Sequence, residues 1–218
     1  LDSSFPGNPD EDGDQSTIDD QPIDSGDSAP DNVLRKITIE QSPVADAFDD
    51  RYIGSSAPDK LKGSSSDDEL KGRNANDVLR SHKGNDYLFG GNGDDKLNAG
   101  QGSDVLQGQK GADMLTGRNG ADVLYGGAGK DSLTGGKGSD IFVLSKGKDV
   151  VTDFKVAKDG IGLVHAVDLD VIQKGDDLLL KDPGLGVRML LENVDRDDFL
   201  RYFPGNLQQV PAVEVDIF

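Results

Sequence analysis

The chain has 218 residues, of which 34% are hydrophobic and 6% aromatic, too few to build a conventional globular core throughout. Its 41 Asp and Glu against 23 Lys and Arg give a net charge of −18, which argues against nucleic acid as a partner and favours cations. The absence of Cys excludes disulfides and thiolate metal sites, and no apolar run approaches the roughly 18 residues that span a membrane.

The N-terminal segment, residues 1–32, is rich in Asp, Ser, Pro and Gly, which is typical of a disordered acidic tail. Residues Asn8 to Asp19 follow the spacing of a helix-flanked calcium loop. However, Pro9 and Gln15 depart from that pattern and no flanking helices are visible, so a solvated linker is the favoured interpretation. The chain opens with neither an initiator Met nor a signal-peptide core, so we expect any N-terminal export signal to lie outside it.

Residues 33–53 contain an alternating stretch from Leu34 to Glu40, which predicts a strand in an N-terminal cap. A nine-residue repeat then dominates the chain. Its copies from Gly63 to Val143 read GSSSDDELK, GRNANDVLR, SHKGNDYLF, GGNGDDKLN, AGQGSDVLQ, GQKGADMLT, GRNGADVLY, GGAGKDSLT and GGKGSDIFV. The phase extends weakly in both directions, so we expect the repeat region to span residues 54–152. A strict period of this kind predicts a solenoid.

Position 6 of the repeat is Asp in every copy, and position 8 is Leu in all but the last, which has Phe142. With the next partial copy, the aspartates are Asp68, Asp77, Asp86, Asp95, Asp104, Asp113, Asp122, Asp131, Asp140 and Asp149. Positions 1 to 5 are mostly small or polar, and Gly there lets backbone carbonyls converge on one point. Carbonyls and carboxylates together form an all-oxygen site that suits Ca²⁺, whereas turn propensity alone would accept Asn or Ser equally well.

Energetics favour a role for the ion in folding. Burying one Leu contributes about 1.5–3 kcal/mol, whereas ordering nine residues costs on the order of 9–18 kcal/mol. An ion of millimolar to submillimolar affinity adds about 4–5.5 kcal/mol when bound. We therefore expect a chain that is largely unfolded without calcium and folded with it.

Beyond residue 153 the period is lost, and the segments DGIGLV, DLDVI, DDLLLK and VRMLLENV read as short strands between turns. Residues 153–218 are expected to form a small β cap over the open end of the solenoid. His82 and His165 complete no metal site, and no nucleophile–base pair or phosphate loop stands out, so no enzymatic activity is predicted.

The repeat GGxGxDxLx resembles that of the RTX, or hemolysin-type, calcium-binding proteins, and GGNGDDKLN, GGAGKDSLT and GGKGSDIFV follow it closely. The resemblance implies an all-β, right-handed parallel β-roll with two repeats per turn. Each calcium ion would lie between loops eighteen residues apart, bound by both aspartates and by carbonyls at positions 2 and 4 of one loop and 1 and 3 of the next.

The carbonyl donors implied by the resemblance belong to five pairs of loops. They are Gly91, Gly93, Gly100, Gly102, Gly108, Gln109, Lys110, Gly111, Gly117, Arg118, Asn119, Gly120, Gly126, Gly127, Ala128, Gly129, Gly135, Lys137, Leu144 and Lys146. The earlier loops depart from the pattern, with Ser66 and Ala75 at position 4. We therefore expect about five complete calcium sites, and up to three more that involve Asp68, Asp77 and Asp86.

Outward positions of the two sheets differ in polarity. One sheet carries an apolar outer set, which we expect to be covered by the C-terminal cap or by a protein or glycan partner: Tyr87, Phe89, Val105, Val123, Tyr125, Ile141 and Val143.

The leading functional prediction is a secreted, extracellular calcium-binding module. The resemblance implies export by a type I secretion machinery through an uncleaved C-terminal signal, and the ending Asp216-Ile-Phe218 is compatible with one. Two alternatives stay open: an accessory domain of a larger secreted protease, lipase or polysaccharide-modifying enzyme, and an adhesin or surface-layer module.

Overall fold

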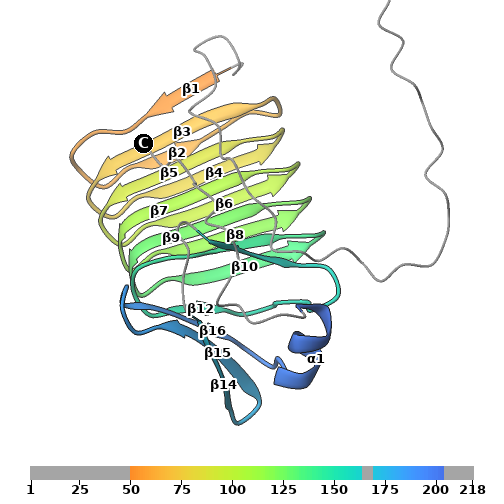
Figure 1. The fold of residues 1–218 in the computed structure, drawn as a ribbon. Helices are drawn as coiled ribbons and strands as arrows, with labels where there is room; N and C mark the ends of the chain where they lie inside the picture. Colours follow the sequence, from red (N-terminus) through yellow and green to blue (C-terminus); the bar gives the residue numbers. More distant parts are fainter. Residues whose placement is uncertain (1–49, 164–168, 204–218) are drawn as a thin grey trace, which may run out of the picture.

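The computed structural model describes residues 50–163 and 169–203, which form a two-sheet parallel β-solenoid of about six turns closed at one end (Figure 1). The acidic tail, the Asn8–Asp19 loop, the Leu34–Glu40 strand, His165 and the C-terminal ending all lie outside the described residues. The all-β roll predicted from the repeat is confirmed.

Odd-numbered strands form one sheet, in the order β1-β3-β5-β7-β9-β11-β13. Their bounds are β1 (Asp50–Ile53), β3 (Asp68–Asn74), β5 (Tyr87–Asn92), β7 (Val105–Gly111), β9 (Val123–Gly129), β11 (Ile141–Leu144) and β13 (Gly160–Leu163). Within the repeats each strand pairs in parallel with the strand eighteen residues later, as Leu88 pairs with Leu106. One turn of the solenoid therefore contains two repeats.

Even-numbered strands begin the second sheet, and the C-terminal strands complete it in the order β14-β15-β16-β12-β10-β8-β6-β4-β2. Their bounds are β2 (Lys60–Lys62), β4 (Val78–Lys83), β6 (Lys96–Gln101), β8 (Met114–Asn119), β10 (Ser132–Lys137), β12 (Asp149–Val151), β14 (Asp170–Lys174), β15 (Asp177–Asp182) and β16 (Val187–Leu191). β14, β15 and β16 are antiparallel to one another, and β16 continues the sheet by pairing in parallel with β12.

The core is a ladder of the position-8 side chains, which point inward because the strand periodicity is two. From Leu70 to Phe142 these side chains are at most 1% exposed. At the C-terminal end the ladder passes into an aromatic cluster, in which Phe154 packs 5.9 Å from Phe142 and 6.2 Å from Phe199 between ring centroids. This cluster closes the end of the core that the repeats leave open.

The sheets extend beyond the expected 54–152 at both ends. β1 already pairs with β3, because Asp50 and Tyr52 carry the repeat phase opposite Asp68 and Leu70. The four segments predicted as strands after residue 153 correspond to β13–β16.

The cap also contains α1 (Arg196–Tyr202), which we did not predict. Asp195 caps this helix by accepting hydrogen bonds from the backbone N of Asp197 and Asp198. No helix of the described ranges is long and apolar enough to cross a membrane.

The described part of the cap extends the end of the roll (Figure 1). The expected apolar face is partly covered, since Val143 at that end is fully buried. Side chains such as Tyr87 and Phe89 are half-buried. They stand in rows across neighbouring strands, where Tyr87 lies opposite Val105 and Val105 opposite Val123, so that they shield one another.

Candidate metal centres

The repeat aspartates stand in two rows, one along each edge of the roll, at the junction of loop and strand. In each row the backbone N of one aspartate donates to Oδ1 of the aspartate of the next turn; for example, Asp77 N lies 2.7 Å from Asp95 Oδ1. One row is Asp59, Asp77, Asp95, Asp113, Asp131 and Asp149. The other is Asp68, Asp86, Asp104, Asp122, Asp140 and Asp159.

Within the part of the chain that the structure describes, the second carboxylate oxygen, Oδ2, has no hydrogen-bond donor in the central part of both rows. The buried Oδ2 atoms without a hydrogen bond are those of Asp77, Asp86, Asp95, Asp104, Asp113, Asp122, Asp131 and Asp140. Leaving one buried polar atom unsatisfied costs about 1–3 kcal/mol, and more when it is charged. A run of eight therefore indicates that a ligand which is not part of the chain neutralises them.

Backbone carbonyls converge on the same points as these oxygens. A Cβ built on Gly90 would lie 2.8 Å from the carbonyl O of Gly108, one turn later, and closer still to Asp95 Oδ2. Gly117 stands in the same relation to Asp122 Oδ2 and to the carbonyl O of Gly135, at 2.8 Å. Position 1 must be small because a carboxylate and a carbonyl of adjacent turns meet in front of it.

Loop conformation is shared by all eight central repeats. Positions 2 and 4 both have positive φ from Arg73 to Gly138, and non-glycine residues adopt it where the repeat departs from Gly, as in Ala75 at 74°. The loops before Asp77 and Asp86, which we expected to give weaker sites, therefore have the same backbone as the glycine-rich ones.

The aspartates at the ends of the rows differ, because position 2 supplies them with a donor. Ser55 Oγ lies 2.9 Å from Asp59 Oδ2, Ser64 Oγ 3.2 Å from Asp68 Oδ2, and Ser145 Oγ 2.6 Å from Asp149 Oδ2. At the last aspartate, Lys155 N donates to Asp159 Oδ2 at 2.7 Å, and the Lys155 ammonium lies 3.9 Å from the same oxygen. Protein groups thus satisfy the terminal carboxylates, including Asp68 and Asp149 of the predicted set.

Burial changes the acidity of the central aspartates. It raises the pKa of Asp86, Asp95 and Asp122 to about 6 and the pKa of Asp104 and Asp113 to about 7. The pKa of the terminal Asp149 is also raised by burial to about 7. Hydrogen bonds to the carboxylates oppose this increase, and neighbouring aspartates of the same row add to it. Binding of a cation would therefore release protons near neutral pH.

The donor set fits a hard cation that accepts several neutral oxygens. No group of three or more His, Cys, Asp or Glu side chains lies together in the described ranges, so a transition-metal site of that kind is absent there. Aspartate pairs with surrounding carbonyls match the oxygen-only, adaptable coordination of Ca²⁺. Sequence reasoning missed Asp159, because the turn before it contains nineteen residues instead of eighteen.

Fold and site together define a parallel β-roll with two rows of loops suited to cations. The model of the RTX calcium-binding nonapeptide repeat matches four times, at residues 44–79, 71–106, 107–142 and 116–151. The repeat region of this chain belongs to that family, as its resemblance to the RTX repeat predicted.

Two solved structures are similar at low identity. Extracellular lipase LipA from Serratia marcescens matches at 20% identity and a TM-score of 0.35, over 68% of this chain and 38% of the lipase. The AlgE6R3 subunit of the Azotobacter vinelandii mannuronan C5-epimerase matches at 21% identity and a TM-score of 0.24, over 72% of this chain and 78% of that one. No curated protein sequence matches. The chain thus corresponds to little more than a third of the lipase.

Proposed function

We propose that this calcium-binding repeat module takes up Ca²⁺ at the eight central aspartates and folds in response to it. The observation that supports this most directly is the run of eight buried Oδ2 atoms without a donor. Bound calcium would supply a positively charged partner for these oxygens. Without it, the ionised carboxylates oppose the close stacking of the turns.

The ligand set proposed for each ion joins two adjacent turns. Around Asp95 it comprises the carbonyls of Gly91 and Gly93 with those of Gly108 and Lys110, together with Asp113. Two observations support the set: Gly108 O faces Asp95 Oδ2, and Gly93 N donates to Lys110 O at 2.8 Å, which holds the two loops together. The same pattern applied along both rows gives the other proposed sites.

The biological consequence we propose is that folding follows export. A chain that stays unfolded at low cytosolic calcium remains competent for a type I secretion channel, and millimolar external calcium then folds it outside the cell. We propose no catalytic role for this segment, since its buried carboxylates belong to the repeat rows, to their ends or to the cap, except Glu69, which is ion-paired with Arg51 and Lys71.

Circular dichroism during a calcium titration tests the proposal. The strand signal should be weak in chelator and rise cooperatively to a plateau with Ca²⁺, while the same concentration of Mg²⁺, which demands a tighter octahedral geometry, should restore little of it. A spectrum that is identical in chelator and in millimolar calcium would show that folding does not depend on the ion.

A further inference from the structure

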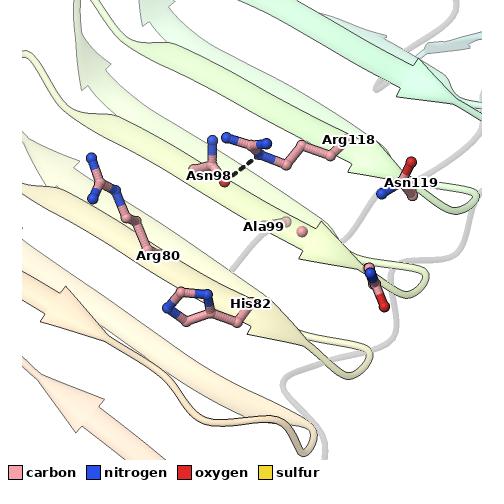
Figure 2. A pocket seen from close by; sticks show the side chains of 8 residues that line it. Arg80, His82, Asn98, Ala99, Arg118 and Asn119 are labelled. Carbon is pink, nitrogen blue, oxygen red and sulfur yellow. Dashed lines mark hydrogen bonds between the residues drawn. The ribbon is translucent and has the colours of Figure 1, made fainter.

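A polar groove of about 510 Å³ crosses the outer face of β4, β6 and β8 and reaches the loop ends of these strands (Figure 2). Its lining residues are Arg80, His82, Asn98, Ala99, Gly100, Gln101, Arg118 and Asn119. Ala99 and Gly100 are buried at its floor, whereas both arginines are exposed.

The repeat itself creates the hollow. In the pairing of β4, β6 and β8, Gly100 lies between His82 and Arg118. Strands are about 4.8 Å apart, so the two long side chains stand roughly 10 Å from each other with no side chain between them. The gap cannot be filled without moving the backbone, because a Cβ on Gly100 would clash with the carbonyl of His82.

The groove belongs to a cationic face in an otherwise acidic chain. Strands β2, β4, β6, β8 and β10 contain neither Asp nor Glu. They carry Lys60, Lys62, Arg80, Lys83, Lys96, Arg118 and Lys137. In a chain of net charge −18, this concentration of positive charge favours anionic ligands on this face.

Two features hold the lining side chains in place. Arg118 Nε donates to Asn98 Oδ1 at 2.7 Å, which fixes the guanidinium over the groove and leaves its terminal nitrogens available (Figure 2). Arg118 and His82 also adopt φ of 86° and 88°, a conformation that favours Gly and that Gly100 and Gly136 occupy at the same repeat position. Long polar side chains are thus present where Gly would be the easier residue.

We propose that this groove binds an extended acidic polysaccharide. Arg80 and Arg118 would bind successive carboxylates, since guanidinium groups recognise carboxylates with two parallel hydrogen bonds. The amides of Gln101 and Asn119 would bind sugar hydroxyls. The groove has no Phe, Tyr or Trp side chain, and His82 is its single ring, so it offers no row of aromatic platforms for the successive bases of a single-stranded nucleic acid. Its strands are paired on both sides, so an added peptide strand does not fit it.

The test uses the calcium-loaded chain and short hyaluronan oligosaccharides, which carry a carboxylate on every second sugar, with chondroitin sulfate and dextran sulfate fragments as further acidic probes. Isothermal titration should show binding of at least one acidic oligosaccharide that weakens as salt is added. Neutral chito-oligosaccharide and monomeric glucuronate should bind at least tenfold more weakly. Equal binding of either, tighter binding of single-stranded DNA, or no binding of any acidic probe would overturn the proposal.

Matched variants distinguish binding in this groove from a general effect of removing positive charge. Arg118→Gln is compatible with the backbone, because Gln109 occupies the same repeat position at φ 77°. Together with Arg80→Gln it should weaken binding at least tenfold. Arg80→Gln alone, at a position that supplies no proposed calcium ligand, should also weaken binding and leave the calcium-induced strand signal unchanged. Arg73→Gln is the control, because Arg73 has the same repeat position and a φ of 85° but lies on β3 in the opposite sheet. Equal weakening by the control would overturn the assignment to this groove.

Discussion

At the scale of single residues, Asp94 and Asp95 carry the same charge in opposite surroundings. Asp95 is buried with a free Oδ2, whereas Asp94 is exposed and accepts a hydrogen bond from Ala112 N. Asp95→Asn keeps the Oδ1 acceptor but places an amide donor where the cation is expected. We predict that it weakens calcium binding about tenfold, or by about 1.4 kcal/mol, at each site that Asp95 joins, and that the calcium concentration at the folding midpoint rises, as measured by circular dichroism.

Asp94→Asn is the control for this change, because Asn76 and Asn85 already accept the same hydrogen bond at that repeat position. It removes an identical charge and should shift the midpoint less than twofold. Equal shifts for the two variants would mean that the titration responds to total charge instead of to specific ligands.

The repeat phase made the aspartates and the leucine core predictable, because each has a fixed place in nine residues. The end groups were not predictable in the same way. Ser64 and Ser145 look like ordinary loop residues, and only the structure shows that each hydroxyl reaches the aspartate four residues later. Asp159 was not predicted from the repeat, because the turn before it departs from the nine-residue period.

At the scale of the loop and its strand, position 2 distinguishes an open loop from a closed one. In the loop before Asp68, the backbone N and the hydroxyl of Ser64 both contact Oδ2, although Ser81 O and Asp86 stand in the next turn as they do in the central loops. Ser64→Gly removes the hydroxyl and permits the positive φ of the central loops. We predict one additional bound calcium ion per chain, counted by native mass spectrometry or equilibrium dialysis.

Ser65→Gly is the matched control for the loop, because Ser65 is the exposed neighbour and the substitution adds the same backbone freedom. It should leave the ion count unchanged. An unchanged count in Ser64→Gly, or an increase in both variants, would show that the serine does not close the loop.

The elements outside the repeat were predictable in part. The four C-terminal strands were predictable from their clear apolar patterns. Their pairing was not predictable, because nothing in VRMLLENV indicates that β16 joins β12 in parallel. Helix α1 was missed because only seven residues follow its cap, although Asp195, the acidic first turn and Arg201 in the last turn are ordinary helix signals.

At the scale of the whole molecule, the aspartate rows set how stability depends on pH. The pKa of Asp104 and Asp113 is about 7 in the metal-free fold, above the ordinary value of 3.8, and burial is the main cause. Between about pH 4 and about pH 7, the folded chain therefore holds more protons than the unfolded chain. Its free energy of unfolding without calcium must fall as pH rises from about 4 to about 7. Protonated carboxyls need no counter-ion, so acid should partly replace calcium.

We therefore predict that in chelator the chain shows more strand signal at about pH 5 than at about pH 7.5, and that the calcium midpoint rises at the lower pH because protons compete for the same oxygens. Circular dichroism with sedimentation velocity, to exclude aggregates near the isoelectric point of 4.3, measures both effects. Asp104→Asn imitates the protonated form permanently. It should increase the metal-free strand signal at neutral pH and weaken its dependence on pH, while reducing the response to calcium. A metal-free signal that instead grows from pH 5 to pH 7.5 would mean that the aspartate rows do not control folding.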